Sequence, residues 1–509
     1  MVDSRTKNTK RNIVAGISYR FVAILFPFIN RTLILWILGA EFTGLASLFT
    51  SILEVLNIAE LGFNYAVVYS LYEPIAKNNY KRINELVSLI KQIYKYVGTF
   101  IFVVGLLITP FITKIINGSY PDSVNIYIIY LLYLINTGVS YYLYAYKEVL
   151  LIAFQRKDIS DNIRTVINII RYIAQFLTLY FTKDYYLFLI VSIVGTVVTN
   201  LLLQYETKKR YSFYESVKYK VSIPNSIKDQ VKGLLIDRLS NVSRNSLSTL
   251  VVSSFLGLTA TAIFGNYYYI YSSLYGFMLV ICNAMAASVG NSIVVESKEK
   301  NFKDLQAFSA LFAIFSGWCS FFLLCLYQPF MTIWAGSDLL LPFRDVVLFS
   351  IFLYVINMTS VRDQYIAGTG IWWKLKMSSV YEIIANAVLC ITLGKLFGIT
   401  GVLISMVLNI FIFNFVWRSV ILFKEYFGIL KIKSFILRHF FLLLIVVLVG
   451  ILTYAICVSI NFENEYYEFA WRLLICAVVP IIVFLLMGKR VGVIKESLNT
   501  FKQFFLRRS

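Results

Sequence analysis

The stretch FFLLLIVVLVGILTYAICV, Phe440–Val458, decides the fold class of this chain. It contains no charged side chain over its whole length. A helix of about 20 apolar residues crosses the hydrocarbon core of a bilayer, and a run of this length exceeds what a strand needs. We therefore expect a transmembrane helix here, within the span 437–459.

Comparable runs occur along the whole chain. Of its 509 residues, 59% are hydrophobic, and the mean hydropathy is +0.73, whereas a soluble domain is typically about 45–50% apolar. The sequence predicts an all-α polytopic membrane protein of about fourteen helices. The expected spans are 13–38, 42–72, 96–116, 124–150, 164–182, 186–205, 233–256, 259–295, 306–333, 343–370, 378–397, 400–423, 437–459 and 468–488.

The net charge of +20 comes from basic residues in short loops between apolar spans. This distribution excludes a basic nucleic-acid-binding domain. Alternate loops are rich in Lys and Arg, and the opposite loops hold only Lys114, Lys183, Arg344, Lys395 and Arg472. The positive-inside rule then places both termini on the cytoplasmic side of the membrane. We interpret the basic, apolar N-terminus as an uncleaved first span rather than a signal peptide.

The largest internal loop, 206–232, falls near the middle of the first twelve spans. It predicts a cytoplasmic linker between an N-lobe of helices 1–6 (1–205) and a C-lobe of helices 7–12 (233–424). Helices 13–14 and a basic tail follow (425–509). A weak repeat supports two lobes, because Leu38-Gly39 recurs as Leu256-Gly257, each at the expected tight turn after the first span of its half.

Charged residues inside spans are candidates for function, because charge is costly in hydrocarbon. Arg20 and Arg31 are eleven residues apart, which places them on one helical face. They line a cavity or, alternatively, snorkel to the two interfaces. In the seventh span, Asp237 and Arg244 belong to a polar stripe flanked by Arg238. This stripe cannot face lipid. It lines a cavity or lies at the cytoplasmic interface.

Polar residues of other spans leave two interpretations open. Tyr144 and Lys147 continue a tyrosine and amide stripe in the fourth span, which suits sugar contact or a polar helix–helix seam. Glu60, Asp237 and Glu382 are candidates for ion coupling or for structural charge pairs. Arginine is in slight excess over acid inside the spans, which favours an anionic ligand such as a phosphate. These arginines are Arg20, Arg31, Arg171, Arg238, Arg244 and Arg362.

The sequence contains no motif for bond chemistry. It has no GxxxxGK[ST] loop, GxSxG or HExxH motif, and no CxxC pair or spaced His/Cys cluster. We therefore expect no enzyme, no cofactor and no metal, and we interpret the six cysteines as small apolar core residues.

Several short segments resemble bacterial oligosaccharide flippases, in the same order along the chain. They are AELG at 59–62, GNYY at 265–268, ASVGN at 287–291 and GITGV at 398–402. This family is the polysaccharide-exporter branch of the multidrug and oligosaccharidyl-lipid exporter superfamily. The resemblance implies two six-helix lobes plus two C-terminal helices around a central cavity. Many relatives carry Asp in the seventh span where this chain has Ser248, which puts a carried-over role for that acid, and its ion coupling, in doubt.

The resemblance also implies a function. A flippase of this kind moves undecaprenyl-pyrophosphate-linked oligosaccharide repeat units to the outer leaflet for capsular or exopolysaccharide biosynthesis. The expected partners are this lipid, membrane lipids, a polysaccharide polymerase and glycosyltransferases, with no nucleic acid. Pyrophosphate would bind Arg20, Arg31 and Arg244, and sugars would contact Tyr144 and Tyr268, with Asn266 beside the latter. The alternatives are a drug/cation antiporter of the same fold and a membrane polysaccharide polymerase or glycosyltransferase.

Overall fold

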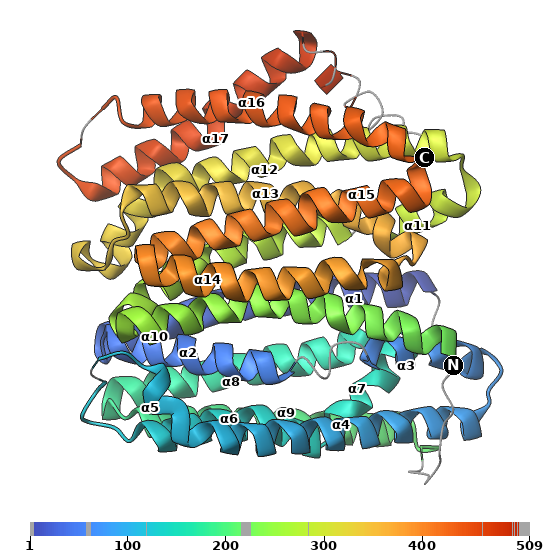
Figure 1. The fold of residues 1–509 in the computed structure, drawn as a ribbon. Helices are drawn as coiled ribbons and strands as arrows, with labels where there is room; N and C mark the ends of the chain where they lie inside the picture. Colours follow the sequence, from blue (N-terminus) through green and yellow to red (C-terminus); the bar gives the residue numbers. More distant parts are fainter. Residues whose placement is uncertain are drawn as a thin grey trace. The chain divides into compact units, whose positions relative to one another are not determined.

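The structure is a computed structural model that describes residues 5–57, 63–118, 120–214, 225–283, 285–460 and 462–490, with 492, 494, 495 and 497. Every regular element within these ranges is a helix (Figure 1). The expected all-α class is therefore confirmed for this part of the chain. Glu60 and positions 215–224 of the expected linker lie outside the described residues.

Nine helical stretches in these ranges are long and apolar enough to cross a membrane, or ten if the bent pair Ile126–Tyr142 and Ala145–Ala153 is one crossing. The stretches Leu235–Val295 and Trp372–Phe427 have 61 and 56 residues, whereas one crossing needs about 20. Each is interrupted by a glycine with a non-helical backbone, Gly257 or Gly398, and each is long enough for two crossings. The polytopic membrane architecture is confirmed, and the side on which the termini lie stays a prediction.

The outer faces of the helices suit lipid rather than water. On α16 (Ile432–Cys457), large apolar side chains are exposed at a spacing of three to four residues. Soluble proteins rarely expose apolar surface as one continuous patch. The exposed row therefore marks a face toward the hydrocarbon of a bilayer. Its members are Leu437, Phe440, Leu444, Leu448 and Ile451.

Contacts divide the chain into two compact units, Met1–Ala262 and Ile263–Ser509. The first unit is built from α1 to α9 and the first part of α10. Asn79, Asn125 and Asp184 cap α4, α6 and α9 by accepting hydrogen bonds from their first turns. The bounds are α1 Arg5–Ile37, α2 Ala40–Leu56, α3 Phe63–Ala76, α4 Tyr80–Ile108, α5 Ile112–Ile115, α6 Ile126–Tyr142, α7 Glu148–Ala153, α8 Lys157–Thr182, α9 Tyr185–Arg210 and α10 Asn225–Asn283.

The first part of α10 belongs to the first unit because it bonds to elements there. The hydroxyls of Ser253 and Ser254 donate to the carbonyl of Ile115, at 3.2 and 3.1 Å. The backbone of Leu258 lies so close to Gly44 that a Cβ at Gly44 would be 2.2 Å from the Leu258 oxygen. The seventh span, 233–256, which the sequence predicts to be the first helix of the C-lobe, thus packs in the first unit. The lobe boundaries stay a prediction.

The repeated Leu-Gly pair lies at two sharp turns of the backbone. Gly39 has φ 99° and ψ 178°, and Gly257 has φ 84° and ψ −175°. Positive φ is strained for residues with a Cβ, so glycine is the residue that permits each turn. At Gly257 a Cβ would also lie 2.6 Å from the carbonyl oxygen of Asn117. The expected tight turns are therefore present at both copies of the pair.

The second unit is built from the remaining part of α10 and from α11 to α17. Its long helices α12, α13, α16 and α17 run side by side (Figure 1). The bounds are α11 Ala286–Val295, α12 Lys298–Ala335, α13 Phe343–Thr369, α14 Trp372–Asn409, a π-helix Ile410–Trp417, α15 Arg418–Leu422, α16 Ile432–Cys457 and α17 Glu465–Arg490.

Candidate functional site

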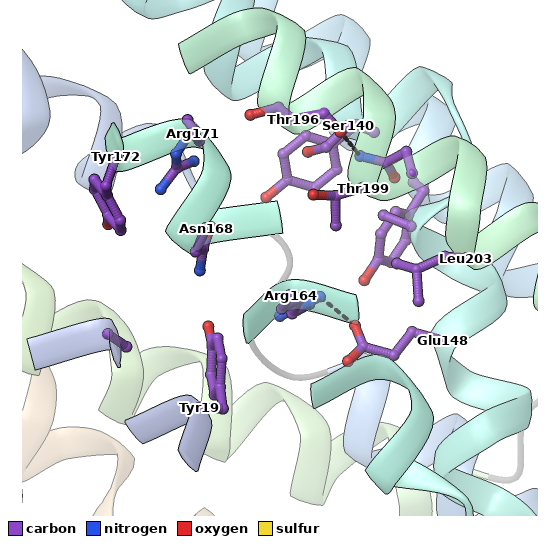
Figure 2. Close-up of a pocket in the computed structure, with 15 residues that line it drawn as sticks. Tyr19, Ser140, Glu148, Arg164, Asn168, Arg171, Tyr172, Thr196, Thr199 and Leu203 are labelled. Atoms are coloured by element: carbon purple, nitrogen blue, oxygen red, sulfur yellow. Dashed lines mark hydrogen bonds and ion pairs between the residues drawn. The ribbon is translucent and has the colours of Figure 1, made fainter. Parts of the chain in front are cut away.

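A cavity of 590 Å³ lies inside the first unit (Figure 2). Its walls come from α1, α4, α6 to α9 and the turn before α7. Most of its lining side chains carry hydroxyl, amide or charged groups. They are Tyr19, Ala23, Tyr94, Ser140, Tyr141, Ala145, Glu148, Arg164, Asn168, Arg171, Tyr172, Thr196, Thr199, Asn200 and Leu203.

Helix α8 supplies the positive charge of this cavity. Arg164, Asn168 and Arg171 are four and three residues apart, which places them on one helical face, and Figure 2 shows them in succession along the helix. The opposite face of α8 exposes Val166, Ile170 and other apolar side chains. Since polar side chains cannot face hydrocarbon without cost, this pattern turns the arginines inward.

The two cavity arginines have different surroundings. Arg164 donates from Nη2 to Oε2 of Glu148 at 2.5 Å, an ion pair that neutralises one charge. Arg171 has no hydrogen bond or ion pair with any described residue, and its Nε is buried without an acceptor. Its guanidinium lies 4.7 Å from the ring centroid of Tyr172. The amide of Asn168, one turn away, is also without a hydrogen bond in the described chain.

Glycine on α9 makes room for Arg171. A Cβ at Gly195 would lie 2.6 Å from Cδ of Arg171, so the stem of the arginine lies directly against the backbone of α9. The cavity therefore presents a positioned guanidinium whose donors are unused. A buried cation costs free energy unless it is paired. The arrangement suits an anionic ligand, and a planar guanidinium fits phosphate oxygens particularly well.

Aromatic and hydroxyl groups surround this charge. The rings of Tyr94 and Tyr141 lie 5.4 Å apart on the α4 and α6 side, and the hydroxyl of Tyr141 donates to Asn57 at 3.2 Å. Thr196 donates to Asn136 at 2.8 Å, which fixes the hydroxyl wall on α9. Rings with neighbouring hydroxyls and amides provide stacking surfaces and hydrogen bonds for a polar, hydroxyl-rich ligand.

The arginines expected in the first span do not line this cavity. Arg20 is exposed on α1, next to the lining residue Tyr19. Arg31 is half-buried and donates to the hydroxyl of Ser47 on α2 at 3.0 Å. It also lies within electrostatic range of Tyr133. Their roles in substrate binding stay predictions.

The polar stripe of the seventh span forms an internal ladder on α10. Arg244 is buried and donates to Asn241 at 2.6 Å, and Asn241 donates to the carbonyl of Asp237 at 3.0 Å. Asp237 is buried, whereas Arg238 is exposed. Ser248 is fully buried and donates to the carbonyl of Arg244 at 2.9 Å.

Tyr144 and Lys147 lie in the break between α6 and α7, close to the cavity residues Ala145 and Glu148. Lys147 is buried, and its Nζ is 5.5 Å from the ring centroid of Tyr144 and 5.3 Å from that of Tyr214. The structure thus brings this pair together by a cation–π contact. Neither side chain lines the cavity itself.

The predicted residues of the second unit are well packed. Asn266 is fully buried, and Tyr268 is half-buried with its ring 5.7 Å from that of Phe264. Glu382 is fully buried and accepts from Nη2 of Arg418 at 2.9 Å. Arg418 also donates to Ser379 at 3.1 Å. The surroundings of Glu382 are therefore those of a structural charge pair, and its role in ion coupling stays a prediction.

Arg164, Asn168 and Arg171 are not among the site residues that the sequence predicts. Arg171 enters the prediction only as one of the arginines inside the spans. The available signal was the spacing of these three residues in a segment whose other face is apolar. A test for a polar stripe along 161–175 would have identified this wall of the cavity.

Comparison with solved structures identifies the architecture. The lipid II flippase MurJ, in an inward closed conformation, superposes with a TM-score of 0.67 and 16% identity over 94% of this chain and 99% of that chain. The chain has the fold of the MOP-superfamily transporters. The MATE transporter VcmN of Vibrio cholerae gives a TM-score of 0.56 at 16% identity over 82% of this chain and 97% of that one.

A third MOP-superfamily transporter, from Pyrococcus furiosus, gives a TM-score of 0.54 at 13% identity over 83% of this chain and 97% of that one. No protein-family model and no curated protein matches the chain. At these identities the MOP likeness establishes the fold, and one fold can serve several functions.

Proposed function

We propose that this protein is a flippase that moves undecaprenyl-pyrophosphate-linked oligosaccharide repeat units from the cytoplasmic to the outer leaflet. The exported units would serve capsular or exopolysaccharide biosynthesis. The observation that carries the proposal is Arg171, an arginine at the cavity whose guanidinium contacts the Tyr172 ring but has no hydrogen bond or ion pair with a described residue. Pyrophosphate offers the charge and the oxygen acceptors that this guanidinium lacks.

The remaining lining fits the sugar part of such a lipid. Four tyrosines, three hydroxyl side chains and two asparagines line the cavity: Tyr19, Tyr94, Tyr141 and Tyr172; Ser140, Thr196 and Thr199; Asn168 and Asn200. Aromatic faces stack on sugar rings, and amides and hydroxyls bond to their hydroxyls. The polyprenyl tail would stay in lipid, where the exposed apolar face of α8 also lies.

The fold is compatible with this substrate class, because one solved neighbour is described as a lipid II flippase. Transport would proceed by alternating access, in which the two halves expose the site to each side in turn. Arg20, Arg31 and Arg244 would guide the head group along its path. The polymerase and glycosyltransferases that use or make the substrate would be functional partners.

A drug/cation antiporter is the second candidate, since other neighbours are MATE transporters. A cationic substrate needs an available acid in the cavity. Glu148 is the one carboxylate among the lining residues, and Arg164 already neutralises it. The charge of the cavity therefore favours an anionic substrate.

The test is flipping by the purified chain in proteoliposomes with a fluorescent undecaprenyl-pyrophosphate oligosaccharide. The readout is the rate at which the lipid becomes accessible to an impermeant quencher. We expect Arg171→Gln to slow flipping by about 10- to 100-fold, the equivalent of one charge-assisted hydrogen bond. The matched control is Arg210→Gln, because Arg210 is paired with Glu206 at the end of α9. Unchanged flipping by the Arg171 variant would refute the proposal, and efflux of cationic dyes would favour the antiporter.

A further inference from the structure

Three cysteines from distant parts of the sequence meet in the second unit. Cys325 lies on α12, Cys457 is the last residue of α16, and Cys476 lies on α17. Their three Sγ atoms all lie within 4.8 Å of one another, and the Sγ atoms of Cys457 and Cys476 are 4.0 Å apart. All three side chains are buried. The cluster is separate from the cavity of the first unit.

The spacing of the sulfur atoms is that of a metal site rather than of a disulfide. Three thiolates bound to one ion in a plane, each at about 2.3 Å, lie roughly 4.0 Å from each other. A disulfide would need the sulfur atoms at about 2.05 Å. We infer that Cys325, Cys457 and Cys476 form a trigonal site for monovalent copper.

The donor set decides which metal fits. Soft sulfur ligands suit Cu(I), zinc and iron–sulfur clusters among the common biological metals, and iron–sulfur clusters are held by four protein ligands. Structural zinc sites take four ligands in a tetrahedron, and no histidine or carboxylate of the described residues joins this group. An apolar shell of Phe322, Leu324, Tyr454, Ile456 and Val479 surrounds the cysteines. Such a shell keeps water from binding the metal as a fourth ligand.

Neighbouring groups hold the three helices in register. Trp318 on α12 donates to the carbonyl of Cys476 at 2.8 Å. Arg472, one helical turn before Cys476 on α17, donates from Nη1 to the carbonyl of Cys325 at 3.1 Å. Its Nη2 is paired with Glu468 at 2.5 Å, so the charge of Arg472 is already balanced within α17.

Binding involves no change of oxidation state. In the metal-free site, the thiols of Cys457 and Cys476 donate to the carbonyls of Arg472 and Phe321, at 3.9 and 3.7 Å. Cu(I) would replace thiol protons, which leave to solvent. The bound ion would join α16 and α17 to α12 and so stabilise the end of the C-terminal helix pair.

The experiment titrates the reduced, purified full chain with Cu(I) under anaerobic conditions, in competition with a coloured Cu(I) chelator. We expect one copper per chain, with a sulfur-to-copper charge-transfer band in the near ultraviolet. Loss of a residue that only hydrogen-bonds a metal ligand weakens metal binding by roughly 10- to 100-fold. Cys325→Ala removes a ligand itself, so it should weaken Cu(I) binding by more than this. Cys319→Ala is the matched control, since Cys319 is buried on the same helix outside the cluster.

X-ray absorption of the copper-loaded wild-type chain keeps the inference testable if a variant does not fold. Three sulfur ligands at about 2.3 Å support the site, and fewer sulfurs or oxygen and nitrogen ligands refute it. Equal retention by Cys325→Ala and wild type, tighter binding of Zn²⁺ than of Cu(I), or a Cys457–Cys476 disulfide in anaerobically prepared protein would each overturn it. None of these results affects the flipping assay.

Discussion

Arginine lies inside both units, but in two different kinds of surroundings. In the first unit, Arg171 lines a cavity and has no hydrogen bond with any described residue. In the second unit, Arg362 is fully buried and donates to the carbonyls of Asn414 and Phe415, to Ser419 and to its neighbour Asp363. A charge within a span is therefore no site by itself. Its partners decide whether it holds the fold or awaits a ligand.

The second unit also shows how the backbone adapts to a structural arginine. Residues Ile410–Trp417 form a π-helix, in which the carbonyls are displaced from the regular α-helical pattern. Arg362 donates hydrogen bonds to two of these carbonyls. Arg418, which directly follows the π-helix, pairs with Glu382. The distorted helix and the two arginines thus form one polar core inside an apolar bundle.

The largest effect should come from breaking the second unit's charge pair. We expect Glu382→Ala to lower the free energy of unfolding by about 3–5 kcal/mol, because it removes the carboxylate that pairs with the buried Arg418 charge. Thermal unfolding of purified protein in detergent measures this. Arg210→Ala, which removes an exposed pair with Glu206, should leave the midpoint nearly unchanged. A loss no larger than this control would mean that the pair is not structural.

Replacing both members of the pair should recover most of that loss. In Glu382→Leu with Arg418→Met, neither charge of this pair stays buried, and apolar groups of similar volume fill their positions. Exchanges of this kind are often neutral or stabilising. We expect the double variant to lie within about 1 kcal/mol of wild type, and a double-mutant cycle gives the coupling. If the double variant is as unstable as Glu382→Ala, the other contacts of Arg418 carry the stability.

The fold could be predicted from the sequence because a bilayer allows few solutions. Uncharged runs such as Phe440–Val458 have to be helices, since hydrocarbon offers no partner for backbone polar groups. The glycines at 39 and 257 could be predicted as turns, because each follows a complete span. The contact of Ser253 with Ile115 could not be predicted. It depends on which helices pack together, and that is set by surfaces far apart in the sequence.

The site was less predictable for the same reason. Arg171 and Arg362 are both arginines in apolar helices, and nothing within four residues of Arg171 reveals that it lacks a partner. The carbonyls that satisfy Arg362 come from residues more than 50 positions away. The cysteine cluster has no local motif either, because its three members lie on three helices. Sequence patterns indicate which groups are costly in a membrane, and packing decides which of them are satisfied.

Displacing Arg171 without removing it sharpens the comparison further. In Gly195→Ala, the new Cβ would meet Cδ of Arg171 at 2.6 Å and push the side chain aside. We expect flipping to slow by about fivefold, which corresponds to about 1 kcal/mol. Stability should not fall, because alanine favours a helix over glycine by roughly 0.5–1 kcal/mol. Gly276→Ala is the control, since no atom lies within 4 Å of its added Cβ. Equal flipping in both variants would show that the position of Arg171 is unimportant.

The smallest effect is the one that separates a binding arginine from a structural one. Arg171 has no hydrogen bond with a described residue to lose, and its contact with the Tyr172 ring contributes about 0.5–1 kcal/mol, so Arg171→Gln should lower the free energy of unfolding by at most about 1 kcal/mol. The unfolding midpoint of Arg171→Gln is compared with that of Glu382→Ala by thermal unfolding. A cooperative transition in the same curve shows that the variant is folded. A loss of several kcal/mol would place Arg171 with Arg362 among the structural charges. An unchanged midpoint together with slow flipping would mean that the chain maintains this cation for its ligand.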